Sequence, residues 1–203
     1  MASVRAVIFD LGGVLYPFRD YNKFKYMCQK ASADPKTKKN LVGWQEGALA
    51  TSDVRDFFEQ TFGILPKNKE LEAVKLEDFM GPKHEKIWKC LKTLKDNNIK
   101  TALLTNNGWW TDKKDKSVIF DDLSLFDVVV ESCKEGICKP NPKIFEITLK
   151  RLGLKPTECA FIDDLEKNVE SANKLGINGI QMVDQNQDLA LEKLQTLVNV
   201  PLK

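Results

Sequence analysis

Three carboxylates and one lysine stand just after short apolar runs of this chain. Asp10 follows the first run, Asp163 and Asp164 follow a later one, and Lys139 lies in a loop after a run between them. Carboxylate oxygens are the ligands that Mg²⁺ prefers, a carboxylate can attack phosphorus, and a lysine can neutralise phosphoryl oxygens. If these residues meet, the chemistry that they suit best is phosphoryl transfer.

Uncharged polar groups accompany these charges. Thr105 and Asn106 follow another apolar run, and Gly12 and Gly13 follow Asp10. Glycine lets the chain turn and lets the backbone approach a ligand closely. Taken singly, each signal also has an ordinary structural interpretation, as a turn residue, a helix cap or a solvated lysine. The set as a whole favours a site.

The spacing of apolar residues predicts the elements that must position these groups. Short continuous runs predict buried strands, and apolar residues three and four apart predict helices. Strands and helices alternate, which predicts an α/β fold with a Rossmann-like parallel sheet covered on both sides. Strands are expected over residues 6–9, 99–104, 127–130, 159–162 and 179–183, and helices over residues 85–96, 142–152 and 189–198. A further helix is expected after Asp164, through Val169, Ala172 and Leu175 as far as Gly176. In such a sheet the carboxyl ends of the strands share one edge, so the polar residues can converge.

Residues 16–83 contain no run typical of a strand, and the helical spacing of their apolar residues predicts a small inserted helical block. The expected helices span residues 21–31, 36–45, 53–62 and 68–80. Pro17 and Gly81-Pro82 mark the two ends of the block. We therefore divide the chain into a core of residues 1–15 and 84–203 and an insertion of residues 16–83. Residues 109–126 are expected to be a long connection that a short helix could occupy in part.

Composition excludes several classes of function. Of 203 residues, 42% are hydrophobic and 30% charged, and the net charge of +2 gives no reason to expect nucleic acid or a membrane surface as partner. The five cysteines form no Cys-x-x-Cys motif, and the first strand begins close to Met1. We therefore expect reduced thiols, no signal peptide and a cytoplasmic location. The one histidine, His84, excludes a multi-histidine metal site and is expected to be solvated.

Four segments, in this order, resemble the motifs of the haloacid dehalogenase-like hydrolase superfamily: Phe9-Asp10-Leu11-Gly12-Gly13-Val14-Leu15, Leu104-Thr105-Asn106, Lys139-Pro140 and Asp163-Asp164. Residues 128–142 and 161–168 are similar to two members in particular. These are the N-terminal phosphatase domain of soluble epoxide hydrolase and the N-terminal domain of acyl-CoA dehydrogenase 10-type proteins. We expect neither of their second domains here. The resemblance implies the α/β core of that superfamily, with residues 16–83 as its cap.

The resemblance also implies a role for each matching residue. Asp10 is expected to be the nucleophile, and Lys139 is expected to steady both the nucleophile and the phosphate. The residues expected to hold Mg²⁺ are Asp10, Gly12 through its carbonyl, Asp164, and Asp163 directly or through water. The residues expected to bind the phosphate of a small phosphorylated substrate are Thr105, Asn106, Lys139 and Asn168.

One position departs from the superfamily pattern. Most of its phosphatases carry a second aspartate two residues after the nucleophile, as general acid and base, and this chain has Gly12 there. General acid–base help contributes roughly 10²–10⁴-fold. Two interpretations therefore stay open, a phosphatase with low activity and an inactive binding or regulatory protein. A dehalogenase, which needs no metal, is disfavoured by Asp163 and Asp164. The sequence leaves the substrate and the oligomeric state open.

Overall fold

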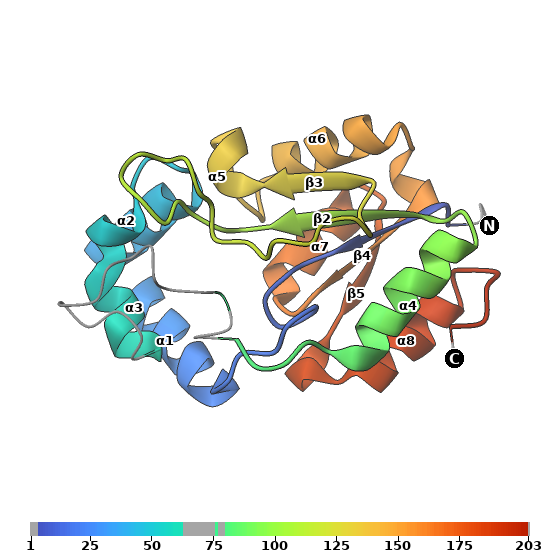
Figure 1. Ribbon diagram of the computed structural model, residues 1–203, viewed down its shortest axis with the longest axis horizontal. Coiled ribbons are helices and arrows are strands. Elements are labelled where there is room, and N and C mark those ends of the chain that lie inside the picture. Colours follow the sequence, from blue (N-terminus) through green and yellow to red (C-terminus); the bar gives the residue numbers. More distant parts are fainter. Residues whose placement is uncertain (1–3, 63–75, 77–79, 203) are drawn as a thin grey trace.

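The computed structural model describes residues 4–62, 76 and 80–202 and has a parallel sheet at its centre. The sheet has five strands in the order β3-β2-β1-β4-β5 (Figure 1). Their bounds are β1 Ala6–Phe9, β2 Lys100–Thr105, β3 Val128–Glu131, β4 Cys159–Asp163 and β5 Asn178–Gln181. The predicted α/β class and all five strands are confirmed, and β5 ends two residues before its expected end.

The central strand explains why the sheet is parallel and enclosed. All four residues of β1 are apolar and fully buried, as expected for a strand covered on both faces. In the register of the sheet, Phe9 pairs with Leu103 of β2 and with Ile162 of β4. Asp10, the residue after β1, therefore comes level with Asp163, the last residue of β4.

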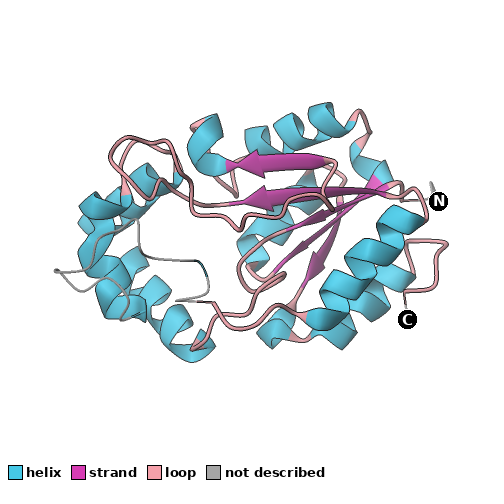
Figure 2. Cartoon of the chain, viewed as in Figure 1, coloured by secondary structure: helices cyan, strands magenta, loops and turns pink. Residues whose placement is uncertain are grey.

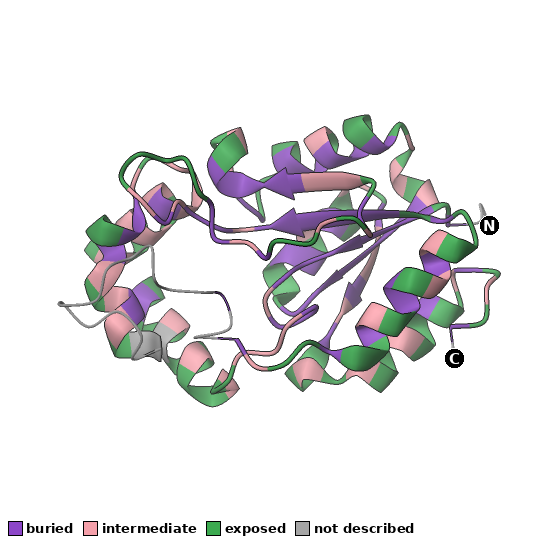
Figure 3. Cartoon of the chain, in the orientation of Figure 1, coloured by how far each residue is buried: buried purple, intermediate pink, exposed green. Residues whose placement is uncertain are grey.

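Helices cover the sheet on both sides (Figures 1 and 2). One face carries α4 (Glu85–Asp96) and α8 (Gln187–Gln195), and the other carries α6 (Pro142–Leu152) and α7 (Glu166–Lys174). Two apolar clusters result. One joins α4 and α8 to Val7 and Phe9, and the other joins α6 and α7 to Ile8 and Phe161. In Figure 3 the strands are largely buried, and α4 and α6 each carry buried residues on one side and exposed residues on another.

Local sequence signals determine where α6 begins and ends. The side chain of Asn141 accepts a hydrogen bond from the backbone of Lys143, and Pro142 occupies the first turn. Gly153 ends the helix with a φ of 67°, a conformation that glycine adopts without steric penalty. The helix predicted from this cap, proline and glycine is confirmed.

The predicted helical block lies beyond the carboxyl ends of the strands (Figure 1). It contains α1 (Tyr21–Ala33), α2 (Pro35–Gln45), the 3-10 turn η1 (Thr51–Val54) and α3 (Arg55–Phe62). Three of the four expected helices are thereby confirmed. The fourth, over residues 68–80, lies outside the described residues except for Leu76 and Met80. Short elements also occur in the core: α5 (Ser132–Glu135), η4 (Pro156–Glu158) and η5 (Val183–Gln185).

Residues 109–126 form the predicted long connection, without a helix; it contains turns and isolated bridges of Trp109 with Ala50 and Ser117. One expectation is wrong. His84, expected to be solvated, is buried. Its ring Nδ1 lies 2.8 Å from the carbonyl oxygen of Val14, and its backbone N–H donates to Leu15. The two linkers of the insertion run side by side there and enclose the ring.

In the part of the chain that the structure describes, every helix is too short or too polar to cross a lipid bilayer.

Candidate active site

A buried lysine joins two of the predicted carboxylates. Lys139 Nζ lies 2.8 Å from Oδ1 of Asp10 and 2.7 Å from Oδ2 of Asp163, and it donates to the carbonyl of Leu104 at 2.9 Å. Only 2% of Lys139 is exposed. A buried ammonium group needs such partners because burial without them is very unfavourable. Residues from β1, β2, β4 and the loop after β3 therefore meet at one point.

The three carboxylates form a single cluster. Asp10, Asp163 and Asp164 each offer an oxygen, and these oxygens lie within 4.8 Å of one another. The parallel register brings Asp10 beside Asp163, and Asp164 is the next residue along the chain. With one lysine among three acids, the cluster has an excess of negative charge. Moreover, Oδ2 of Asp164 is buried and has no hydrogen-bond partner among the described residues. Hard oxygen donors and an unpartnered carboxylate oxygen are what a divalent cation such as Mg²⁺ requires.

The cluster changes the acidity of its members. Burial raises the pKa of Asp10 to about 7; the Lys139 ammonium opposes this rise, and the Asp163 carboxylate adds to it. Burial, together with the charges of Asp163 and Asp10, holds the pKa of Asp164 well above its usual range. Although burial alone would lower the pKa of Lys139, the carboxylates of Asp10 and Asp163 raise it. Lys139 is therefore a permanent cation in a site with too much negative charge.

Asn168 holds Asp163 in place from α7. Its Nδ2 donates to both carboxylate oxygens of Asp163, at 3.0 and 3.1 Å, and the backbone of Leu165 donates to Oδ1 at 2.9 Å. Together with Lys139, these donors occupy the carboxylate of Asp163. The Oδ1 of Asn168 is buried without a partner among the described residues. The structure thus brings Asn168 to the cluster, where its amide donates to Asp163.

The segment after β2 supports the lysine. The side chain of Asn106 accepts a hydrogen bond from the backbone N–H of Lys139 at 2.8 Å and donates to its carbonyl at 2.9 Å. Both ends of this amide are therefore engaged with the main chain of Lys139. Thr105, the last residue of β2, is buried one register position beyond the level of Asp10. Both residues lie at the carboxyl end of β2, and their role in phosphate binding stays a prediction.

Gly12 and Gly13, the two residues after Leu11, differ in what an added side chain would contact. Gly13 has a φ of +75°, and a Cβ there would lie 2.7 Å from the carboxylate of Asp164. Only glycine fits that backbone conformation so near the cluster. A Cβ on Gly12 would lie 2.8 Å from Cζ of Phe18 and 3.5 Å from Cε of Met80. Phe18 therefore occupies the space into which a side chain at position 12 would point.

Sequence reasoning missed Phe18 and Gln181. Phe18 reaches the site because the first linker folds back over Gly12, a contact with no local signal. Gln181 ends β5 and donates from Nε2 to the backbone carbonyl of Asp164 at 3.2 Å. The one available sign of Gln181 was a polar residue inside the apolar run of the predicted strand 179–183.

A family model and two longer proteins match most of this chain. The family model described as haloacid dehalogenase-like hydrolase matches residues 4–176. The chain is 32% identical to acyl-CoA dehydrogenase family member 10 from Mus musculus, over 98% of this chain and 20% of the relative. It is also 32% identical to bifunctional epoxide hydrolase 2 from Sus scrofa, over 98% of this chain and 40% of the relative. The chain thus spans less than half the length of these relatives.

Proteins of similar length are also similar to the chain. A phosphatase from Mycobacterium tuberculosis is 25% identical over 96% of this chain and 95% of its own length. A solved haloacid dehalogenase-like hydrolase structure from Porphyromonas gingivalis has a TM-score of 0.67 and 23% identity, over 97% of this chain and 98% of that one. The magnesium complex of a Bacteroides thetaiotaomicron enzyme gives 0.64 and 23%, over 91% and 96%. At these identities the two structures support the fold.

Proposed function

Since the chain belongs to the haloacid dehalogenase-like hydrolase family, we propose that it is a Mg²⁺-dependent phosphatase acting on a small phosphorylated metabolite through an aspartyl phosphate. The observation that carries the proposal is the buried Lys139 between Asp10 and Asp163, beside the unpartnered carboxylate oxygen of Asp164. Relatives named as phosphatases, such as the one from Mycobacterium tuberculosis, support the same reaction class.

Asp10 is the proposed nucleophile. Its carboxylate attacks phosphorus, the bond from phosphorus to the leaving oxygen breaks, and water then releases phosphate from the aspartyl phosphate. Lys139 holds Asp10 in place with its 2.8 Å contact and neutralises a phosphoryl oxygen as charge develops there. Thr105 offers its hydroxyl to the phosphate, Asn106 keeps the main chain of Lys139 in position, and Asn168 keeps the carboxylate of Asp163 in position.

The proposed residues that hold Mg²⁺ are Asp10, Asp164, the carbonyl of Gly12, and Asp163 either directly or through water. When bound, the cation supplies positive charge that stabilises the transferring phosphoryl group and draws it to the nucleophile. Residues 16–83 are proposed as the cap domain, because the helices of this block stand beyond the carboxyl ends of the strands, where the cluster lies (Figure 1).

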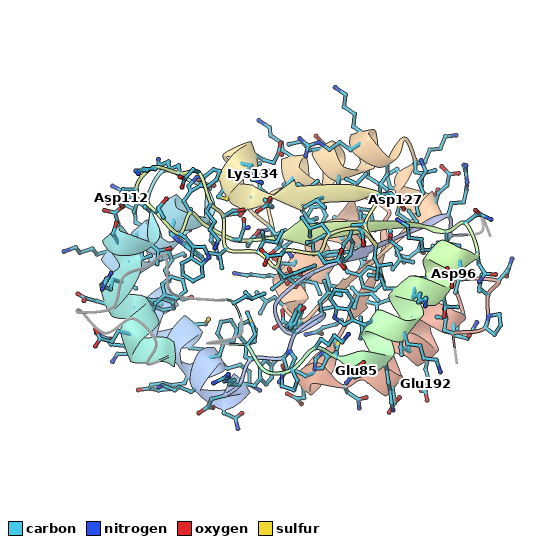
Figure 4. The ribbon with its side chains drawn as sticks, in the orientation of Figure 1. Glu85, Asp96, Asp112, Asp127, Lys134 and Glu192 are labelled. Atoms are coloured by element: carbon cyan, nitrogen blue, oxygen red, sulfur yellow. The ribbon has the colours of Figure 1, made fainter. Side chains whose placement is uncertain are left out.

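The mechanism is tested by replacing the nucleophile. Asp10→Asn keeps the shape of the side chain but removes the attacking carboxylate, so release of inorganic phosphate from 4-nitrophenyl phosphate with Mg²⁺ falls to background. Asp96→Asn is the matched control: Asp96 is exposed at the end of α4, on an outer helix (Figure 4), and activity stays at the level of the unmodified chain. Full activity of Asp10→Asn would refute the aspartyl-phosphate mechanism.

A second candidate function follows from Gly12 and Phe18. Because Phe18 fills the space above Gly12, the described site has no carboxylate at the position of the usual general acid. A protein that binds a phosphorylated ligand without hydrolysing it fits this observation. That function is favoured if the chain binds Mg²⁺ and inorganic phosphate but releases no phosphate from sugar, lipid or acyl phosphates.

A further inference from the structure

Among the described residues, an apolar wall and not a proton donor lines the leaving-group side of the proposed site. The wall consists of Phe18, Phe24 and Met80. The rings of Phe18 and Phe24 stack with centroids 3.6 Å apart and planes 11° apart. Phe18 Cζ would lie 2.8 Å from a Cβ on Gly12, and Met80 Cε 3.5 Å from it. A carboxylate at position 12 therefore has no room unless Phe18 moves.

The backbone holds Phe18 in this place from several sides. Phe18 and Met80 form an antiparallel bridge between the two linkers, and Gly81 N–H donates to the carbonyl of Pro17 at 2.7 Å. The backbone N–H of Phe18 also donates to Oε1 of Gln185 at 3.0 Å, from the turn after β5. The ring is therefore a positioned part of the site and not a side chain that happens to lie near it.

Two ionisable side chains near this wall, in the part of the chain that the structure describes, are poorly suited to donate a proton. His84 Nδ1 lies 2.8 Å from the carbonyl of Val14, and burial lowers the pKa of this ring. Tyr21 lies at the start of α1, and the ammonium of Lys25 lies 4.5 Å from the centroid of its ring. Burial and the nearby Asp164 raise the pKa of the Tyr21 phenol, which makes it a weaker acid.

We propose that this chain acts on phosphorylated compounds whose leaving oxygen is stable without a proton, namely acyl, enol and aryl phosphates. The inference rests on the proposed phosphatase function and adds its substrate class. Asp10 forms the new bond to phosphorus while the bond to the leaving oxygen breaks, and that oxygen departs with the electron pair as a carboxylate, enolate or aryloxide. Water then attacks phosphorus and frees the Asp10 carboxylate, and the proton of this water passes to the solvent or to the departed anion.

The test compares phosphate esters that differ in the acidity of the leaving group. Phenyl and cyclohexyl phosphate have similar size and polarity, but phenol, with a pKa of about 10, is far more acidic than cyclohexanol. The expected kcat/KM for phenyl phosphate exceeds that for cyclohexyl phosphate by more than roughly 10²-fold, the usual size of general-acid help. 4-Nitrophenyl and acetyl phosphate extend the series. Values of kcat/KM for phenyl and cyclohexyl phosphate within roughly tenfold of each other overturn the inference.

Variants separate the missing proton donor from the shape of the wall. The variants are compared by the ratio of kcat/KM for phenyl phosphate to kcat/KM for cyclohexyl phosphate. Phe18→Ala with Gly12→Asp makes room for a carboxylate, so kcat/KM for cyclohexyl phosphate rises and this ratio decreases. Phe18→Ala alone enlarges the space without adding a donor, and the ratio is unchanged. A ratio that collapses in Phe18→Ala alone shows that shape controls selection, and it overturns the inference. Tyr21→Phe is expected to leave the ratio unchanged. A ratio that widens in this variant identifies the phenol as a proton donor and also overturns the inference.

A second readout distinguishes this inference from the proposed function. Mixing the chain with each ester and Mg²⁺, followed by an acid quench and mass spectrometry, detects phosphate on Asp10. Labelling by acetyl and aryl phosphates but not by cyclohexyl phosphate supports both proposals. Equal labelling by every ester refutes the substrate class alone. The absence of any label, with no hydrolysis, refutes the phosphatase itself.

Discussion

At the scale of single residues, the site is a set of buried charges that balance one another incompletely. Lys139 forms ion pairs with two carboxylates, those of Asp10 and Asp163. One carboxylate oxygen of Asp164 has no hydrogen-bond partner among the described residues. Such a set is unfavourable by itself, because each buried charge loses its hydration. A cation held by these oxygens, as proposed for Mg²⁺, would offset this cost.

Lys139→Met should therefore affect both activity and stability. Without the ammonium group, Asp10 loses its ion pair with Lys139. Phosphate release is expected to fall by roughly 10²–10³-fold, the usual effect of removing a group that stabilises charge in the transition state. Breaking a buried ion pair also lowers the free energy of unfolding by about 3–5 kcal/mol. Urea denaturation and a phosphate assay measure the two effects. Lys92→Met on the exposed side of α4 is the matched control and should change the free energy of unfolding by less than about 0.5 kcal/mol. Activity of Lys139→Met close to the control would contradict this role.

The stability of the metal-free chain should fall as the pH rises from about 4 to about 7. The pKa of Asp10 rises from its ordinary 3.8 to about 7 in the folded chain, mainly through burial. Over this window the folded state keeps a proton that the unfolded state has lost, so the free energy of unfolding decreases with pH. Protonation and its stabilising effect are complete below the lower value.

Mg²⁺ should restore this stability above the window and have little effect below it. At a concentration about 100 times its Kd, a ligand that binds only the folded state adds about 2.7 kcal/mol. Urea denaturation at about pH 5 and about pH 8, with EDTA or with Mg²⁺, measures the difference. Asp164→Asn removes one proposed ligand and should reduce the gain at the higher pH. An equal gain at both pH values would argue against carboxylate ligands.

At the scale of elements, close contacts join the helical block to the core. The indole of Trp44, near the end of α2, packs against Gly108 in the segment after β2, where a Cβ would lie 2.1 Å from the ring. The Nε1 of Trp44 donates to Thr51 Oγ1 at 3.1 Å, and Thr51 in turn donates to the carbonyl of Trp109. The absence of a side chain at Gly108 is what lets α2 approach the core.

Gly108→Ala should therefore weaken this docking. A methyl group forced against a rigid ring usually lowers the free energy of unfolding by about 1–3 kcal/mol. Trp44→Leu makes room, so the double variant should lose less stability than the sum of the two single variants. A double-mutant cycle in urea measures this coupling. Strictly additive losses would mean that Gly108 and Trp44 do not meet in solution.

At the scale of the whole molecule, the helical block is an insertion that leaves and re-enters the core at one place. The antiparallel bridge between Phe18 and Met80 brings the two linkers together. The block nevertheless contributes Trp44, Val54 and Phe58 to the apolar cluster that also contains residues of α4 and α8. The block is thus separate in topology and shares part of the core in packing.

Replacing residues 19–79 by a two-residue Gly turn between Phe18 and Met80 tests this division. Paired residues of an antiparallel bridge are close enough for such a turn. The shortened chain should fold and still bind Mg²⁺. Its free energy of unfolding should fall by roughly 2–5 kcal/mol because apolar contacts are lost. Circular dichroism during urea denaturation and calorimetric titration of Mg²⁺ check both points. Loss of cooperative unfolding would show that residues 16–83 are not a separable domain.

The sequence by itself determined the sheet, most of the helices and the residues of the acidic cluster. These depend on local patterns: apolar runs predict strands, Asn141, Pro142 and Gly153 bound a helix, and polar residues at strand ends share one edge of a parallel sheet. The α/β class, the five strands and the position of the acidic cluster could be predicted for this reason, because each signal lies within a few residues of the element that it describes.

The tertiary structure alone decided how those groups are used. Phe18 lies over Gly12, Asn106 holds the main chain of Lys139, and His84 is buried between the linkers. Each of these contacts joins segments that lie apart in the chain, so no local pattern encodes it. The physical reason is that hydrogen bonding and burial depend on which groups the folded chain brings together, whereas secondary structure depends mainly on the order of neighbouring residues.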